Sequence, residues 1–247
     1  MSMFRSTTGD FIFSPLSDLL AEAVDAIRVA EAGMMGYQMA DWVMPTVFLR
    51  MTGAQEQKLM CIYWDLGSLD LDQRYQRYSG KMGGMSCYDD KKKLCGELLS
   101  YIIRNNQSYN PVTDIDRQKL LDDTKSCIEA ICGNSVMKDW YASDYKDFEE
   151  VTARFKAEEL VKWNIDKRKC SDLFSGELYS AFDTLYNHRN RCAHNSSSYQ
   201  RNLPKFDVMS GTYAVFENYF IRFYILILLD MLFVLLYRTV VSLVELD

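Results

Sequence analysis

Apolar residues recur at intervals of three and four along most of the 247-residue chain, which is the spacing that forms one face of an α-helix. The segment 14–31 shows this first, with Ser14 suited to cap a helix and Pro15 suited to its first position. Its apolar face comprises Leu16, Leu19, Leu20, Val24 and Ile27. With 4 prolines and 12 glycines in the whole chain, breaks are few, and we expect an almost purely α-helical protein.

The same periodicity predicts further helices downstream. Pro45 is expected to interrupt the next apolar run, which restarts over 52–70 to form a helical hairpin with the first helix. The three glycines of 79–90 indicate a loop. Helices are then predicted over 91–105, 115–133 and 144–163, and within 170–194, before a polar loop over 195–205. We interpret 1–247 as one all-α domain with an N-terminal helical part, about 1–160, and a second part, about 165–247.

A very apolar helix is predicted from about Val208 to Val244. Its most apolar run, Phe223 to Tyr237, is 15 residues long and has Asp230 at its centre. A membrane span needs about 20 predominantly apolar residues, and an aspartate in mid-bilayer is costly. We therefore expect no stable membrane insertion, and a helix buried on nearly all sides, partly by a second subunit. A membrane anchor is the alternative, which partitioning between soluble and detergent fractions would test.

Composition limits the other classes of protein. The net charge of −6 argues against a chain that coats nucleic acid along its whole surface. Residues 1–13 contain no apolar run long enough for a signal peptide, so a cytoplasmic location is expected. The seven cysteines are odd in number and lack CxxC spacing, which predicts reduced, mostly buried thiols. With two histidines in the chain, neither a metal site nor a cofactor is predicted.

Both histidines fall in one short stretch, NHRNRCAHNSSSYQ, at 187–200. The preceding positions Leu178, Phe182 and Leu185 share a helical stripe with Arg189, so the guanidinium is expected to point inward. A buried permanent charge needs an anionic or carbonyl partner. We interpret Arg189 as a phosphate ligand, Asn190 as a residue that orients a neighbour, and His194 as a proton carrier near neutral pH.

The surroundings of this stretch are basic. Between 186 and 206 the chain carries four cations and no acidic residue. The predicted RNA-binding residues are Arg191, Arg201 and Lys205, extended by Lys167, Arg168 and Lys169. A histidine and an arginine can cleave RNA without a metal, because the 2′-hydroxyl supplies the nucleophile and arginine stabilises the charge growing on the phosphate. The pattern therefore favours RNA as the ligand.

The sequence RNRCAH, Arg189 to His194, resembles the R-x4–6-H motif of the HEPN superfamily, including the polar residue after the arginine, Asn190. The resemblance covers about 165–247. It implies an all-α bundle in which two copies meet as a homodimer and form a metal-independent endoribonuclease site, with Arg189 and His194 catalytic and Asn190 in support. It also implies a toxin or anti-phage (abortive infection) role in bacterial defence, and an antitoxin or other regulatory protein as a further partner.

Each residue also has a structural interpretation. Arg189 can pair with a core carboxylate such as Asp230, and His194 can interact with the dipole at the end of its helix. His188 is expected at the surface or lining a loop, and Cys192 to serve packing because no base is assigned to it. The lysines 91–93 are expected to form a solvated helix start.

Two function classes therefore remain open. One is the dimeric ribonuclease, and the other is a non-catalytic helical dimerisation module that binds a nucleotide or RNA without cutting. Dependence of cleavage on Arg189 and His194 distinguishes them.

Overall fold

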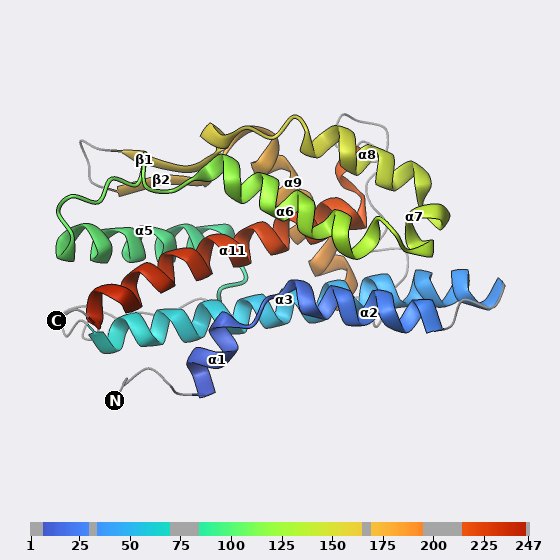
Figure 1. Cartoon of the computed structure of the whole chain (residues 1–247), viewed down its shortest axis with the longest axis horizontal. Helices are drawn as coiled ribbons and strands as arrows, with labels where there is room; N and C mark the ends of the chain where they lie inside the picture. The colour runs from blue at the N-terminus through green and yellow to red at the C-terminus, as the bar shows by residue number, and fades with distance from the viewer. Residues whose placement is uncertain (1–6, 30–33, 70–83, 165–168, 195–213, 246–247) are drawn as a thin grey trace.

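The computed structural model of this chain describes residues 7–29, 34–69, 84–164, 169–194 and 214–245 (Figure 1). The helices in chain order are α1 (Thr7–Phe13), α2 (Ser17–Val29), α3 (Met34–Leu69), α5 (Tyr88–Asn105), α6 (Arg117–Cys132), α7 (Val136–Trp140), α8 (Ala142–Thr152), α9 (Gly176–His194) and α11 (Tyr219–Val244). Short 3-10 helices cover Ala157–Glu159 and Ala214–Phe216, and two strands, β1 (Leu160–Asn164) and β2 (Lys169–Phe174), form an antiparallel pair. The predicted all-α character is thus confirmed apart from this hairpin.

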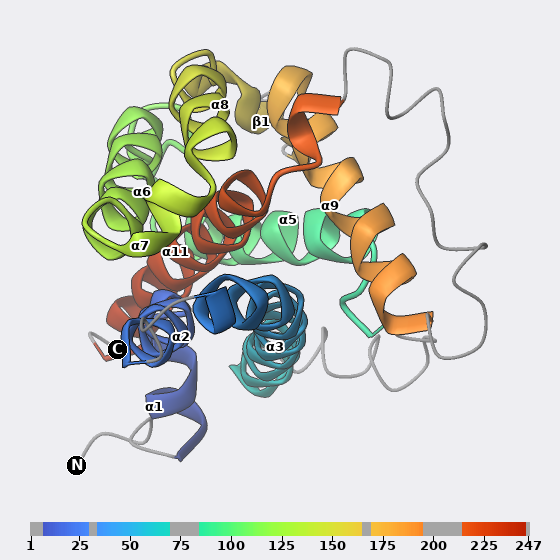
Figure 2. The same cartoon turned by 90° about the vertical axis from the view of Figure 1, so that its right-hand side faces the viewer.

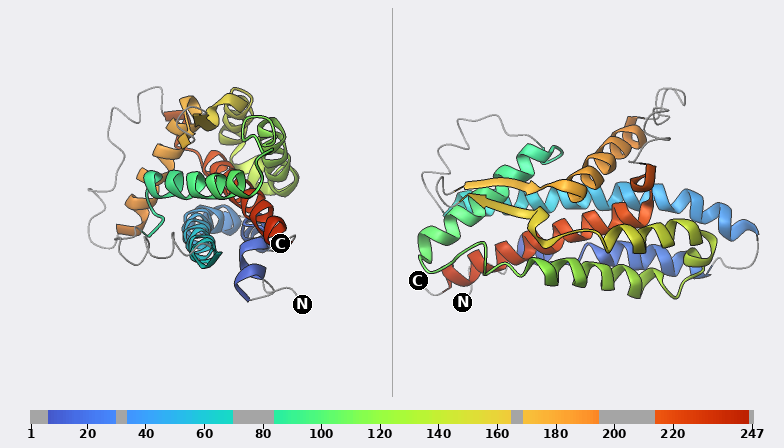
Figure 3. Two further views of the ribbon diagram at one scale, coloured as in Figure 1. Left: turned by 90° about the vertical axis from the view of Figure 1, so that its left-hand side faces the viewer. Right: turned by 90° about the horizontal axis from the view of Figure 1, so that it is seen from above.

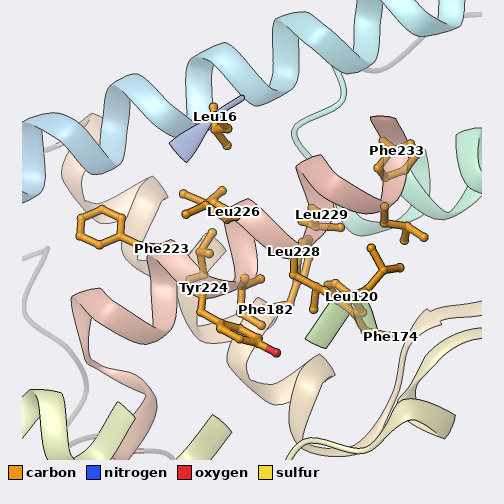
Figure 4. Close-up of a cluster of buried hydrophobic side chains, with 14 of the residues drawn as sticks. Leu16, Leu120, Phe174, Phe182, Phe223, Tyr224, Leu226, Leu228, Leu229 and Phe233 are labelled. Atoms are coloured by element: carbon orange, nitrogen blue, oxygen red, sulfur yellow. The ribbon is translucent and has the colours of Figure 1, made fainter. Parts of the chain in front are cut away.

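Helix α11 is the central element of the fold. It lies in the middle of the molecule with α2, α3, α5, α6, α8 and α9 arranged around it (Figure 2). Its side chains pack against those of α6, α9, β2 and the turn before α2 (Figure 4). Phe182 of α9 and Phe174 of β2 are two of these packed residues. By length and composition α11 is the one described helix able to cross a membrane, but 78% of its most apolar window is buried inside the protein. Burial on nearly all sides was predicted and is confirmed.

Two details of that helix differ from expectation. It begins at Tyr219 rather than near Val208, because Asn218 caps it by accepting hydrogen bonds from the backbone N–H groups of Phe220 and Ile221. The burial also comes from elements of the same chain, so no second subunit is needed to cover it. The apolar character of α11 therefore gives no support for a dimer.

Helix α3 runs without a break through Pro45, so the predicted interruption is wrong. Buried apolar side chains flank the proline on both sides, namely Met44, Val47, Phe48 and Met51. Proline removes one hydrogen bond from a helix, but burial of this stripe outweighs that loss. The predicted pairing with the preceding helix is confirmed, since α2 packs on α3 through the predicted face. The predicted helices 91–105 and 115–133 are also found, as α5 and α6, with Gly133 at the C-cap of α6.

The predicted helix over 144–163 is wrong in its second half. Helix α8 ends at Thr152, and Leu160–Asn164 instead forms β1, which pairs with β2 in the register Leu160 to Phe174. The hairpin lies over α5 (Figure 1). Strand β2 leads into α9 through Gly176, whose φ of 56° is a conformation that suits glycine. A Cβ atom at this position would collide with the Glu159 carboxylate. Glu159 accepts a hydrogen bond from the Leu178 N–H (3.3 Å), which anchors the start of α9.

A buried ion pair joins α3 to α11. Lys58 Nζ lies 2.5 Å from Asp230 Oδ1 and donates to the Ser14 carbonyl at 2.6 Å. The second Asp230 oxygen accepts from the Leu16 N–H at 2.9 Å. Asp230 therefore pairs with Lys58 and not with Arg189, and the pair holds the turn between α1 and α2 against the core. Burial raises the pKa of Asp230, and Lys58 opposes that rise.

One hydrophobic cluster includes side chains from both halves of the chain. Phe48 of α3 and Leu98 of α5 belong to it together with Phe182 of α9 and Leu229 of α11. The position of α9 is therefore set by contacts that are distant in sequence.

Candidate active site

Helix α9 carries the RNRCAH stretch and lies along the outer edge of the molecule, with its C-terminal end at the periphery (Figure 2). The three apolar residues of its inner stripe are fully buried: Leu178, Phe182 and Leu185. Arg189 continues that stripe, and its side chain is 24% exposed. The prediction that Arg189 points inward at the end of an apolar face is therefore confirmed. His194 is the last residue of α9, and its side chain lies outside the described part of the chain.

The Arg189 guanidinium is held by two side chains. Its Nη2 donates to Glu56 Oε2 of α3 at 3.0 Å, and its Nη1 donates to Asn190 Oδ1 at 3.3 Å. Glu56 is itself only 14% exposed. The expected anionic partner is thus a carboxylate of α3, in a pair shielded from solvent on its inner side.

A buried lysine lies beneath this pair. Lys91 of α5 is 0% exposed, donates to the Met85 carbonyl, and lies 4.8 Å from the centre of the Tyr186 ring. Burial lowers its pKa to about 8, with Glu56 opposing and Arg189 adding to that shift. Among the described residues, Glu56 Oε1 and the Tyr186 hydroxyl are buried without a hydrogen-bond partner. The expected solvated lysine start is therefore wrong at Lys91, although Lys93 is 70% exposed.

The other side of α9 holds His188, which directly precedes the RNRCAH motif. The His188 ring lies between Phe48 and Tyr219, with centroid distances of 5.3 and 5.4 Å. Its Nε2 is 3.0 Å from the Tyr219 hydroxyl. Burial first, and then the charges of Arg222 and Arg191, lower its pKa to about 3. His188 is therefore a partly buried, neutral imidazole and not the surface residue that was expected.

Arg191 lies on the same side of α9 as His188. It donates to both carboxylate oxygens of Glu217, at 2.8 and 3.0 Å, and Arg222 of α11 donates to the same carboxylate. Glu217 also lies 3.9 Å from His188 Nδ1. Both contacts come from one nitrogen, Arg191 Nη2, which bridges the two Glu217 oxygens. This predicted RNA ligand is therefore paired with a protein carboxylate in the described structure.

Cys192 lies one turn after His188, and its Sγ is 3.3 Å from His188 Nε2. The structure thus supplies an imidazole that the sequence had not assigned to this thiol. Burial raises the pKa of Cys192 while the pKa of His188 is lowered, so both shifts oppose transfer of the thiol proton to the ring. This arrangement is typical of a thiol that serves packing and not of an activated nucleophile.

Of the remaining predicted RNA-binding residues, Lys169 alone lies in the described part of the chain. Lys169 is exposed at the first position of β2, and this end of the hairpin lies away from the C-terminal end of α9 (Figure 3). Lys167, Arg168, Arg201 and Lys205 lie outside the described residues. The suggested continuity between the 167–169 run and the motif is therefore not seen at Lys169.

Glu56, Lys91, Glu217 and Arg222 were missed by the sequence analysis. Lys91 lies on the buried stripe of α5, three and four positions before Leu94 and Cys95, so helical spacing could have indicated its burial. Glu56 meets Arg189 of α9 and Lys91 meets the Tyr186 ring of α9, and no local pattern indicates these two contacts because α9 is far along the chain. Within the described residues, no three His, Cys, Asp or Glu side chains are grouped as a metal site would require. Comparison with known proteins finds no matching family model, no matching curated protein and no matching solved structure.

The buried imidazole leads to a prediction about acid stability. Because the pKa of His188 falls from 6.5 to about 3 on folding, the unfolded chain binds more protons between these pH values. Stability from this residue is complete above pH 6.5 and is lost as pH falls toward 3, at about 1.4 kcal/mol per pKa unit. Between neutral and acidic pH, His188→Gln should therefore lose less of its free energy of unfolding than the wild type does.

The measurement is urea unfolding of both proteins at several pH values from 7 to 4. The stability difference between them should change in favour of the variant as the pH falls. A difference that is constant with pH would contradict a buried, neutral His188.

Proposed function

We propose that the protein is a metal-independent endoribonuclease whose reactive groups are Arg189 and His194 of α9, with Asn190 in support. The observation that carries the proposal is the placement of Arg189. Its guanidinium stands at the end of a buried stripe, at the outer end of α9, and is oriented by Glu56 and Asn190 five positions before His194. An arginine fixed in this way can meet a phosphate without first reorganising.

The reaction requires no group that the chain lacks. The 2′-hydroxyl oxygen of a ribose forms a bond to the adjacent phosphorus, and His194 takes the proton of that hydroxyl. The bond from phosphorus to the 5′-oxygen breaks, and the leaving oxygen takes up a proton from water. Arg189 stabilises the negative charge on the phosphate oxygens. The products are a 2′,3′-cyclic phosphate and a free 5′-hydroxyl.

The site is proposed to form between two copies. At 3.6 residues per turn, positions 189 and 194 lie about 140° apart around the axis of α9, so the two side chains leave one helix in different directions. A second copy of α9 packed against the first brings an arginine of one chain toward a histidine of the other. This arrangement is the HEPN-like homodimer that the motif resembles. We further propose a cytoplasmic toxin or anti-phage role, restrained by an antitoxin or regulatory protein.

The experiment that tests this proposal compares two substrates of the same sequence. One is a labelled single-stranded RNA, and the other carries 2′-deoxyribose at every position. In EDTA the RNA should be cut to products with cyclic phosphate ends, and the deoxy strand should stay intact because it has no internal nucleophile. Equal cutting of both strands would contradict the 2′-hydroxyl mechanism.

Glu56 should act as a positioning residue in this reaction. In Glu56→Gln the side chain keeps its size but loses the charge that holds the Arg189 guanidinium. We expect kcat for RNA cleavage to fall about tenfold with little change in KM, because misplacing a reacting group slows the chemical step. Glu129→Gln, at an exposed pair with Lys125 on α6, is the matched control and should leave kcat unchanged. Faster cleavage by Glu56→Gln would show instead that Glu56 competes with the substrate phosphate.

A second function is favoured by one specific observation. The Arg189–Glu56 pair satisfies the guanidinium with a protein carboxylate, which is what a structural arginine in a non-catalytic helical module requires. In that case the protein binds RNA or a partner without cutting. Purified dimer that binds RNA but leaves it intact would support this function.

A further inference from the structure

A cleft lies at the hairpin, away from the Arg189 end of α9. It has a volume of about 700 Å³, within the range of about 300–1,000 Å³ typical of small-molecule sites. Its walls come from the last turns of α5, the turn that follows, and β1. The lining residues are Ser100, Ile103, Arg104, Gln107, Tyr109, Asn110, Pro111 and Trp163. A smaller hollow of about 400 Å³ also includes Trp163 in its lining, so this side chain borders both spaces.

The lining of the larger cleft has a definite chemistry. Trp163 and Tyr109 offer aromatic rings, Arg104 offers a cation, and Gln107 and Asn110 offer amides. No carboxylate is among the side chains that line this described cleft. Burial raises the pKa of Tyr109 to about 12, so its hydroxyl keeps its proton and can donate. Aromatic faces with a nearby guanidinium and amides suit a planar ring that carries an anionic group.

The walls of the cleft are braced by one arginine. Arg117 Nε donates to the Leu160 carbonyl at 2.8 Å, and its Nη1 and Nη2 donate to the Val112 and Pro111 carbonyls, each at 2.7 Å. Nη2 also donates to the Val161 carbonyl at 3.2 Å. The guanidinium thus ties the turn after α5 to β1 on either side of the cleft.

The backbone of β1 is strained at this place. Val161 has a φ of 51°, which is unfavourable for a β-branched residue, and the ladder is irregular between Lys162 and Trp163. Strained backbone persists only where the surroundings fix it, and such positions cluster at ligand sites. Trp163 lies at this irregularity and is partly buried against the core, so its side chain is restrained.

We propose that this cleft binds a nucleotide, with its base stacked on Trp163 and its phosphate at Arg104. The nucleotide can be a free molecule or one unit of a single-stranded RNA, since both present the same ring and phosphate. The proposal goes beyond the ribonuclease function and does not depend on it, because the cleft shares no residue with the Arg189 cluster.

The test is binding of two probes to the full-length protein in EDTA. The first is a fluorescein-labelled 2′-O-methyl oligoadenylate of eight residues, which has no 2′-hydroxyl and resists cleavage at the proposed active site. The second is unlabelled AMP as a competitor. Fluorescence anisotropy should report binding of the oligonucleotide. Competition by AMP at concentrations below about 1 mM assigns the cleft to a free nucleotide, and binding of the oligonucleotide without such competition assigns it to an RNA strand.

Two variants locate the binding. Trp163→Ala should weaken it about tenfold or more, as expected for loss of one stacked base, and Arg104→Ala about fivefold. Arg104 is exposed, so its variant keeps the test valid even if Trp163→Ala fails to fold. Arg28→Ala is the matched control, because Arg28 is also an exposed arginine in the last turn of a helix, and it should bind like the wild type.

The proposal would be overturned if neither probe binds, or if binding is the same in Arg104→Ala as in the wild type. Binding is measured without cleavage, so the nucleotide-binding proposal can hold even if the protein does not cleave RNA. In the same way, the ribonuclease proposal can hold even if the cleft binds no nucleotide.

Discussion

Replacing Arg189 with alanine is expected to reduce RNA cleavage about a thousandfold while the fold survives. Removing a single preorganised donor from a developing negative charge costs about 10²–10³ in rate, and Arg189 is the guanidinium fixed at the site. Arg189→Lys should retain part of the activity, because it keeps the charge but loses the planar arrangement of donors. The measurement is the initial rate on labelled RNA in EDTA, with thermal unfolding of each variant alongside.

Arg154→Ala provides the control for this experiment. Arg154 is half exposed and pairs with Glu177 at the start of α9, so its loss should leave cleavage within about twofold. An Arg189→Ala protein that is folded and as active as the wild type would remove Arg189 from the mechanism. One that is inactive because it unfolds would favour a structural role, in which Glu56 is left as an unpaired buried charge.

The second large effect concerns stability. Asp230→Ala should lower the free energy of unfolding by about 3–5 kcal/mol, because it leaves Lys58 buried without its counter-ion. It also removes the acceptor of the Leu16 N–H, so the turn between α1 and α2 loses an anchor. The measurement is urea unfolding at neutral pH, with the change in stability taken from the shift in the midpoint.

Two further variants make this prediction specific. The double variant Lys58→Met, Asp230→Leu should recover much of the lost stability, because apolar groups of similar size replace both charges. Lys146→Ala removes an exposed pair with Glu150 and should change stability by less than about 0.5 kcal/mol. A single Asp230→Ala variant as stable as the wild type would contradict a buried, coupled pair.

The helices that could be predicted from the sequence are those whose apolar stripe is their own local property. Leu20, Val24 and Ile27 of α2 were predicted to form a buried face, and all three are buried. Strands β1 and β2 form a local hairpin, which was missed because the apolar spacing of 144–163 also fits a helix and because the hairpin packs against α5, which lies far along the chain. Pro45 was misjudged for a related reason, since burial of the neighbouring side chains outweighs a local preference that is real.

For the candidate site, helical spacing was enough to predict that Arg189 faces inward, but not what it meets there. Glu56 is contributed by α3 and Lys91 by α5, both more than ninety positions earlier in the chain. The same limit explains His188, which looks solvent-exposed beside two arginines in the sequence. Phe48 and Tyr219 enclose it only once α3 and α11 have packed on α9.

The most direct test of the central proposal is RNA cleavage in EDTA by the purified wild type beside His194→Ala. The wild type alone should cut the RNA and leave 2′,3′-cyclic phosphate ends, and the variant should be folded and inactive. Equal cutting by the two proteins, or intact RNA with both, would contradict a ribonuclease site built on His194 and Arg189.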